Sequence, residues 1–221
     1  MIMLCPPGVY RPQSDTAVLA GAMEKGDLAR GRTVLDVGAG SGALAIAAAR
    51  AGAAAVTAVD LSLRSVLTTW ANSRLHRAAV TVRRGDLFGP ARRSRYDLVL
   101  ANPPYVPAAT AVLPRHRIDR CWDGGPDGRA VLDRICAGAA DVLNPSGTLL
   151  LVHSAVCGVE TTIQRLAEGG LAARVVERAS IPFGPVMRAR AAMLELRGLV
   201  PQGETTEELV VVAASRDGGA A

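Results

Sequence analysis

The chain has 221 residues, of which 49% are hydrophobic and 20% charged, which suits a folded domain with a sizeable core and excludes a disordered chain. The formal net charge of +5 comes from 25 Lys and Arg, nearly all of them Arg, and leaves an acidic partner such as RNA or DNA open. No apolar run is long enough to cross a bilayer and the N-terminus does not resemble a signal peptide, so we expect no membrane partner and a cytoplasmic location.

Helical and extended patterns alternate along the chain. In chain order they predict a helix over 15–25, a strand over 33–37, a helix over 42–51, a strand over 55–60, a helix over 62–75, strands over 79–83 and 96–101, a helix over 128–142, a strand over 147–153, a helix over 158–168, and strands over 172–179 and 208–215. This alternation is typical of an α/β fold with a doubly wound, mostly parallel, seven-stranded sheet and helices on both faces. We expect a single domain over 1–221, with a core over 9–216 and flexible ends over 1–8 and 217–221. Ligands of such sheets bind beyond the carboxyl ends of the strands.

A glycine-rich loop follows the first strand and precedes a helix. Gly38, Gly40 and Gly42 let the backbone turn sharply and approach a ligand closely, and the helix N-terminus offers free N–H groups. The spacing Gly38-x-Gly40-x-x-Ala43 also fits a loose dinucleotide fingerprint, and a tight turn that binds nothing would look similar. The loop alone therefore does not identify a ligand.

Acidic residues stand in or after three successive strands. Asp36 lies inside the first strand, where a carboxylate can meet an ammonium group but would repel a pyrophosphate. Asp60 ends the second strand, where it can accept from a ribose diol or cap the next helix. Asp86 follows the third strand, where it can accept from the amine of adenine beside the Leu87 N–H, or act only as a turn residue. In series they predict contact with a ligand whose ribose is common to NAD and S-adenosylmethionine.

The fourth strand ends abruptly in "DLVLANPPYVP", residues 97–107. Two prolines remove two backbone donors and fix φ, so the chain can neither continue as sheet nor begin a helix. The stiff turn that remains holds the amide of Asn102, the carbonyl groups of Pro103 and Pro104, and the phenol of Tyr105. Packing alone gives little reason for such a turn after a central strand.

Together these motifs resemble class I S-adenosylmethionine-dependent methyltransferases, which have a Rossmann-like fold, and the NPPY turn resembles the branch that methylates planar nitrogens. The resemblance implies that the Asn102 oxygen and the Pro103 carbonyl hold the two hydrogens of an –NH2 group, that Pro104 stiffens the turn, and that Tyr105 packs on the flat face of the acceptor. Two acceptors raise the electron density on a delocalised nitrogen and aim its lone pair at the sulfonium methyl.

Two further stretches, "GVYRPQSDT" (8–16) and "CWDGGPDGRAVLDR" (121–134), resemble the short HemK-like protein-glutamine N5-methyltransferases that act on the GGQ loop of translation release factors. The resemblance covers about 8–180 and the last strand. It implies S-adenosyl-L-methionine as cofactor and a release factor-like protein as substrate. The implied cofactor-binding residues are Thr16, Asp36, Gly38, Gly40, Gly42, Asp60, Asp86, Leu87 and Asn102.

Two features depart from that family. Ser14 stands where the family usually has a glutamate before Asp-Thr. Residues 182–207 form an insertion between the last two strands, with a helix predicted over 185–197 that gates the cavity, contacts a substrate or partner, or merely covers the fold. Eukaryotic relatives work with a small zinc-binding partner protein, so a small activating partner is a further expectation from the resemblance.

Other acceptors stay open, because NPPY also occurs in nucleic-acid methyltransferases. N-methylation of adenine or another exocyclic amine in RNA or DNA is the main alternative, favoured by the arginine clusters at 83–84 and 92–95, which also fit a solvated face. A protein lysine or a small molecule is a further alternative, whereas an NAD-dependent dehydrogenase would leave NPPY unexplained and a purely binding protein would predict a blocked cavity. The four scattered cysteines form no Cys-x-x-Cys pair and His76, His116 and His153 stand in no motif, so we expect no metal site.

Overall fold

The computed structural model describes residues 2–111 and 118–216, so the predictions for His116 and for residues 1 and 217–221 lie outside the described residues. The strands are β1 (Thr33–Val37), β2 (Ala55–Asp60), β3 (Val80–Arg84), β4 (Tyr96–Ala101), β5 (Leu143–Ser154), β6 (Ala172–Pro182) and β7 (Thr206–Ser215). The α-helices are α1 (Ser14–Lys25), α2 (Ala43–Arg50), α3 (Leu63–Leu75), α4 (Leu132–Gly138), α5 (Val159–Glu168) and α6 (Pro185–Leu196).

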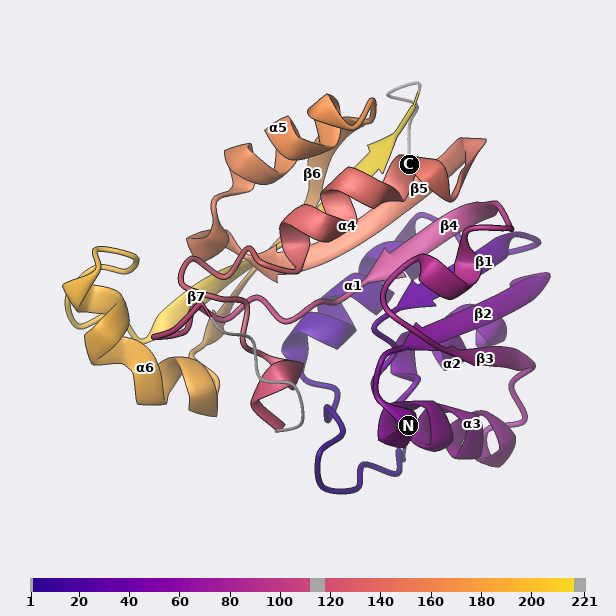
Figure 1. Cartoon of the computed structure of the whole chain (residues 1–221), viewed down its shortest axis with the longest axis horizontal. Helices are drawn as coiled ribbons and strands as arrows, with labels where there is room; N and C mark the ends of the chain where they lie inside the picture. The colour runs from indigo at the N-terminus through magenta and orange to yellow at the C-terminus, as the bar shows by residue number, and fades with distance from the viewer. Residues whose placement is uncertain (1, 112–117, 217–221) are drawn as a thin grey trace.

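All seven strands form one sheet in the order β3-β2-β1-β4-β5-β7-β6 (Figure 1). β7 runs antiparallel to β5 and β6, and the other neighbouring strands are parallel. The predicted fold class is confirmed: a mostly parallel, doubly wound sheet whose strand order reverses between β1 and β4. No helix of the described residues is both long and apolar enough to cross a bilayer.

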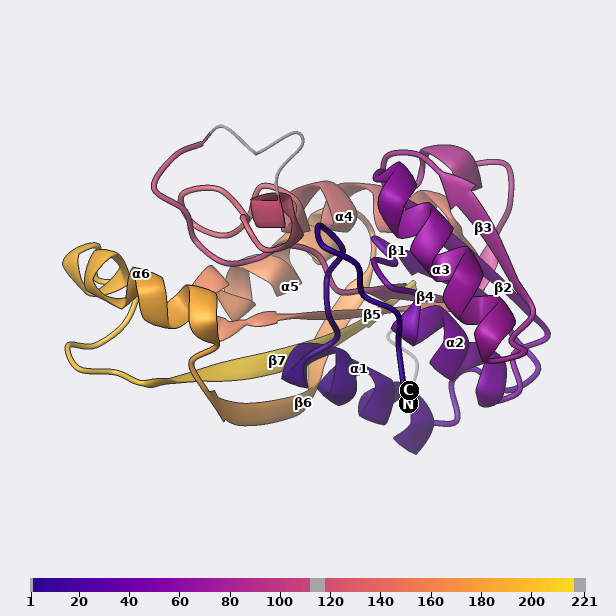
Figure 2. The same cartoon turned by 90° about the horizontal axis from the view of Figure 1, so that it is seen from below.

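Helices cover both faces of the sheet (Figure 2), and each face carries its own hydrophobic cluster. On one face α1 and α2 pack through residues such as Leu19 and Leu44, and on the other α4 and α5 pack through residues such as Ile135 and Leu166. The central strands are buried from both sides, so Val34 and Leu35 point to opposite layers and both are fully buried. This two-sided burial is why the central strands read as continuous apolar runs.

Helix α3 packs on the glycine-rich loop through polar side chains. The Thr69 hydroxyl donates to the Gly40 carbonyl at 3.1 Å, and the Asn72 Nδ2 donates to the Ser41 carbonyl at 2.9 Å. Asn72 also exchanges two hydrogen bonds with the backbone of Leu4, at 2.9 and 3.0 Å. The buried side of this helix is therefore polar because it satisfies backbone groups that the loop and the N-terminal segment leave free.

The predicted helix over 128–142 is shorter than expected, because α4 begins only at Leu132. Gly128 has φ = +78°, and a Cβ at that position would lie 2.2 Å from the Tyr105 carbonyl oxygen. Only glycine allows this approach. Residues 128–131 are therefore part of a loop that packs against the NPPY turn.

Candidate active site

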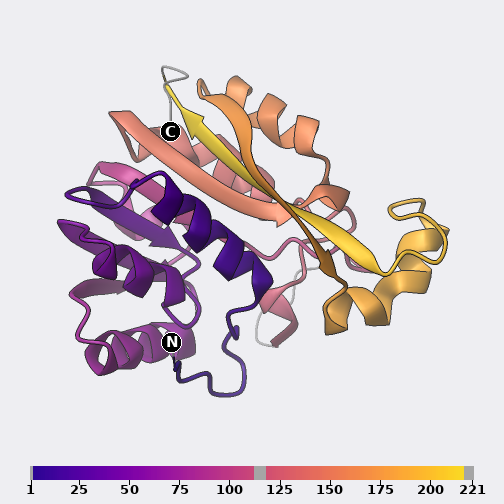
Figure 3. The ribbon, with the colours of Figure 1, turned by 180° about the vertical axis from the view of Figure 1, so that it is seen from behind.

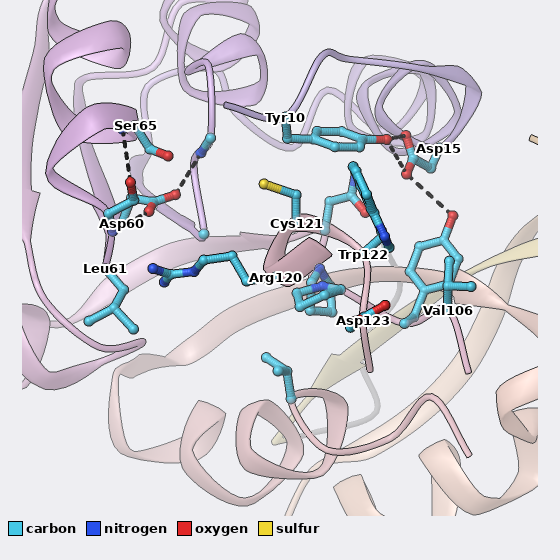
Figure 4. A pocket seen from close by; sticks show the side chains of 18 of the residues that line it. Tyr10, Asp15, Asp60, Leu61, Ser65, Val106, Arg120, Cys121, Trp122 and Asp123 are labelled. Carbon is cyan, nitrogen blue, oxygen red and sulfur yellow. Dashed lines mark hydrogen bonds between the residues drawn. The ribbon is translucent and has the colours of Figure 1, made fainter. Parts of the chain in front are cut away.

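A cavity of about 1130 Å³ opens at the carboxyl ends of the parallel strands (Figure 4). Its wall contains nine of the residues predicted from the sequence: Gly38, Gly40, Asp60, Asp86, Leu87, Asn102, Pro103, Pro104 and Tyr105. The other three, Thr16, Asp36 and Gly42, are buried behind the wall. The fold thus brings the loops after β1, β2, β3 and β4 to one space, as a doubly wound sheet requires.

The three loop glycines all have positive φ, at 74° for Gly38, 57° for Gly40 and 86° for Gly42, but they differ in surroundings. A Cβ on Gly42 would lie 2.8 Å from Cγ2 of Thr69, so this glycine is needed for packing against α3. A Cβ on Gly38 would meet nothing within 4 Å. Gly38 therefore leaves open space at the cavity where a ligand can approach the backbone.

Asp60 holds the glycine-rich loop and the start of α3. Its Oδ2 accepts from the Gly40 N–H at 2.9 Å and its Oδ1 from the Ser62 N–H at 2.8 Å, while Ser62 caps the helix by accepting from Ser65. Burial raises the pKa of Asp60, and these two hydrogen bonds act in the opposite direction by stabilising the ionised form. A carboxylate has about four acceptor positions, so after the Gly40 and Ser62 N–H groups and a contact with the Ser65 hydroxyl, Asp60 still has capacity to accept from a ribose hydroxyl group at the cavity.

Asp36 is buried beneath the same loop. Its Oδ2 accepts from the Ala45 N–H at 3.0 Å, which ties β1 to the first turn of α2. Burial raises the pKa of Asp36 to about 7. In this arrangement the carboxyl group supports the loop from behind.

Asp86 forms an ion pair with Arg134 of α4, at 2.6 Å, and both side chains are about half exposed. The adjacent Leu87 has φ = +45°, a conformation that is uncommon for residues other than glycine. Leu87, at this strained turn, lines the cavity. Arg134, which the sequence reasoning did not single out, lines the cavity beside it.

A chain of hydrogen bonds fixes the Asn102 amide. Its Nδ2 donates to the Thr16 hydroxyl at 3.2 Å, and that hydroxyl donates to Oδ1 of Asp15 at 3.2 Å. Since the NH2 side of the amide is turned toward α1, its Oδ1 is left to accept from a ligand. Pro103, the next residue, also lines the cavity.

Asp15 is the centre of this network. The phenol of Tyr10 donates to both Asp15 oxygens at 2.7 Å (Figure 4). The phenol of Tyr105 donates to Asp15 Oδ2 at 3.3 Å. Burial raises the pKa of both tyrosines, so they remain protonated donors. The N-cap residue of α1 is Gln13, so Asp15 and Thr16 lie inside the first turn of the helix. The network around Asp15 was not predicted from the sequence. The only sign of it in the sequence is that Tyr10 and Asp15 stand five residues apart in the 8–16 stretch.

The segment between β6 and β7 contacts the loop that follows NPPY. Helix α6, which confirms the predicted helix, projects beyond the end of the sheet (Figure 3). Arg190 of α6 donates to the Pro107 carbonyl at 2.9 Å and pairs with Asp123, and Arg197 donates to the Ala108 carbonyl at 2.9 Å. Two arginines, neither of them predicted, thus fasten the insertion to the acceptor side of the cavity.

The matching family model is the methyltransferase small domain, over residues 3–114, about half of the chain. A Methanocaldococcus jannaschii protein, named for an inferred protein N5-glutamine methyltransferase activity, is 29% identical over 82% of this chain and 90% of its own length. The release factor glutamine methyltransferase of Moorella thermoacetica is 39% identical over 66% of this chain, but the match spans only 54% of that relative.

Among solved structures, the E. cuniculi Mtq2–Trm112 complex, which methylates the translation termination factor eRF1, contains a chain of the same fold. The TM-score is 0.65 at 24% identity, covering 95% of this chain and 99% of that one. The family model and the relatives thus indicate a methyltransferase, which is also the class of enzyme that the NPPY turn and the glycine-rich loop predict. The chain belongs to the methyltransferase small domain family, in the HemK-like branch of the S-adenosylmethionine-dependent methyltransferases.

Proposed function

We propose that this protein methylates the side-chain amide nitrogen of a glutamine in a protein of the release-factor type. The observation that carries the proposal is the fixed Asn102 amide, whose nitrogen donates to Thr16 and whose oxygen is left for the acceptor. The names of relatives that match most of this chain, and of the release-factor enzymes among them, support the same acceptor class.

The cofactor half of the cavity fits S-adenosylmethionine. The open side of Gly38 accommodates a ligand close to the backbone, Asp60 offers acceptors for the ribose diol, and the Leu87 N–H is at hand for the adenine. The Asp86 carboxylate would bind the adenine amine while it also pairs with Arg134. When bound, the cofactor supplies a methyl group on a positively charged sulfur.

The acceptor half holds and activates a planar nitrogen. Asn102 Oδ1 and the Pro103 carbonyl accept the two N–H groups of the amide, which concentrates electron density on nitrogen and points its lone pair toward the cofactor. Tyr105, fixed through Asp15, presents its ring to the flat face of the amide. The nitrogen loses one proton to water once it carries the methyl group, so no strong general base is required.

The test is methyl transfer from tritiated S-adenosylmethionine to purified release factor, to the same factor with the GGQ glutamine changed to alanine, and to total RNA and DNA. We expect label on the intact factor only, and a loss of at least about a hundredfold in Asn102→Ala, because a positioned acceptor is worth several kcal/mol in the transition state. Label on nucleic acid instead would overturn the proposed acceptor. Calorimetry with the cofactor shows whether the variant remains folded and binds it.

We propose, further, that a small partner protein covers helix α3. The exposed side of this helix is apolar: Leu63, Leu67 and Trp70 are 51%, 58% and 53% exposed and recur at a spacing of four and three residues, which places them on one face. An exposed apolar stripe of this kind is typical of a protein–protein interface. The solved E. cuniculi relative is itself a complex with Trm112.

A further inference from the structure

Glu207, the second residue of β7, is a buried carboxyl group in the cavity wall. It is only 7% exposed, and its Oε2 has no hydrogen-bond partner among the residues that the structure describes. Leu209 and Val211, the next residues on the same side of the strand, are fully buried and apolar. The nearby Ser154 hydroxyl, which is also buried and has no other hydrogen-bond partner among the described residues, interacts with this carboxyl group. A hydroxyl group satisfies only part of the hydrogen-bonding capacity of a carboxyl group, and Glu207 also lines the cavity, so the remaining capacity is placed where a polar group of a ligand can bind.

Glu207 belongs to the acceptor half of the cavity. The glycine-rich loop, Asp60 and Asp86 follow β1, β2 and β3, which form one half of the sheet. β7 lies in the other half, beyond β4 and its NPPY turn, and Glu207 shares the cavity wall with Tyr105 and with Met187 of α6. Glu207 therefore lies on the side of the NPPY turn that faces away from the glycine-rich loop, Asp60 and Asp86.

The surroundings favour the protonated carboxyl group. Among the residues that the structure describes, the titratable groups that face Glu207 are Asp15 from α1, Tyr105 from the NPPY turn and Cys157 from the turn after β5, and none of these three is a cation. Burial raises the pKa of Glu207, the Ser154 hydroxyl lowers it and the negative charge of Asp15 raises it. A protonated carboxyl group has one O–H to donate, and this is what an amide carbonyl oxygen requires.

We propose that Glu207 donates a hydrogen bond to the carbonyl oxygen of the acceptor amide, an inference that rests on the glutamine acceptor proposed above. Asn102 and Pro103 account for the two N–H groups of that amide, and Glu207 accounts for its third polar atom. The bond orients the plane of the amide and selects it over a lysine or an adenine amine, neither of which has a carbonyl oxygen on the carbon bearing the nitrogen. Glu207 is thus a positioning and specificity residue, whereas activation of the nitrogen comes from Asn102 and Pro103.

The experiment compares wild type, Glu207→Gln and Glu207→Leu on the release factor across a pH series, with KM for the factor, kcat and cofactor affinity measured for each. Glu207→Leu removes the donor, and we expect KM for the factor to rise at least about tenfold while cofactor affinity stays within about twofold. Glu207→Gln keeps an N–H donor that does not titrate. Its kcat/KM should therefore lack the decline that we expect in wild type as pH rises through the pKa of Glu207.

The outcomes separate this inference from the proposed function. If wild type does not methylate glutamine, the proposed function fails before any variant is compared. If it does, and all three proteins share one KM and one pH profile, only the inference about Glu207 is wrong. The inference about Glu207 would also be wrong if the activity of wild type rose with pH and Glu207→Gln were inactive. That result would mean that the reaction requires the ionised carboxylate, for example to bind a cation. Glu207→Gln tests the inference even if Glu207→Leu fails to fold.

Discussion

At the residue scale, the orientation of the Asn102 side chain depends on residues far away in the chain. An amide can be turned by 180° about its last bond with little change in shape, and only its hydrogen-bond partners decide which end faces the ligand. The Thr16 hydroxyl accepts from the amide nitrogen and donates its own O–H to Asp15, so the amide oxygen is left for the proposed acceptor. The orientation of a residue after β4 thus depends on the first turn of α1.

Thr16→Val keeps the shape of the side chain and removes this acceptor. We expect kcat/KM for the protein substrate to fall about tenfold, because the Asn102 amide loses the bond that orients it, with cofactor affinity little changed. Thr16→Ser, which keeps the hydroxyl, is the matched control and should remain near wild type. A loss of cofactor affinity with unchanged kcat would instead indicate that Thr16 contacts the cofactor, as the family resemblance implies.

At the element scale, α3 has the reverse of the usual amphipathic arrangement. Its buried residues are Ser65, Thr68, Thr69, Asn72 and Ser73, all polar, whereas its exposed face carries leucines and a tryptophan. Helices of globular proteins normally bury the apolar face. A partner protein on the outer face would explain this arrangement, because the inner face has to satisfy the backbone of the glycine-rich loop.

The partner proposal predicts the effect of one charge on that face. Leu67→Glu should weaken the binding of a Trm112-like protein at least about tenfold, because a buried unpaired carboxylate is expensive at an interface. Leu196→Glu on α6 is the matched control, since Leu196 is 90% exposed but lies on another surface, and it should bind like wild type. Isothermal titration with purified proteins gives both affinities. Equal affinities for wild type and Leu67→Glu would place the partner elsewhere.

At the scale of the whole molecule, Asp36 links pH to stability. Its pKa in the folded protein is about 7, above the value of about 4 for an unfolded chain, because burial penalises its charge. The folded state therefore holds the proton more tightly, and this contribution to stability is full below about pH 4 and is lost as pH rises toward 7 and beyond. The shift corresponds to a loss of up to about 4 kcal/mol.

Asp36→Asn cannot ionise and keeps an oxygen for the Ala45 N–H. We expect this variant to be more stable than wild type at pH 8, with the difference vanishing near pH 4, in urea unfolding at the two pH values. A difference that is the same at both would show that the carboxyl group does not titrate on folding.

The sequence by itself determined the layered fold and the position of the cavity. The strand and helix patterns gave all seven strands, since two-sided burial demands continuous apolar runs, and the loops after β1 to β4 had to meet because parallel strands end at one edge. NPPY pointed to the chemistry because its rigidity and bare carbonyls are local properties. The predicted start of the helix at residue 128 was wrong, because α4 begins at Leu132. A contact between Gly128 and Tyr105, which are far apart in the sequence, overrides the helical preference of residues 128–131.

Only the tertiary structure decided which residues touch which. Sequence patterns reveal period and local conformation, but hydrogen bonds such as that between Asn102 and Thr16, or the pinning of the NPPY loop by Arg190, join positions 83 or more residues apart. Glu207 could have been suspected, because it shares the buried side of β7 with Leu209 and Val211, where a carboxyl group is out of place. Its environment, and hence its proposed role, exists only when β7, α1 and the NPPY turn come together, because burial and neighbouring charge are properties of the packed molecule.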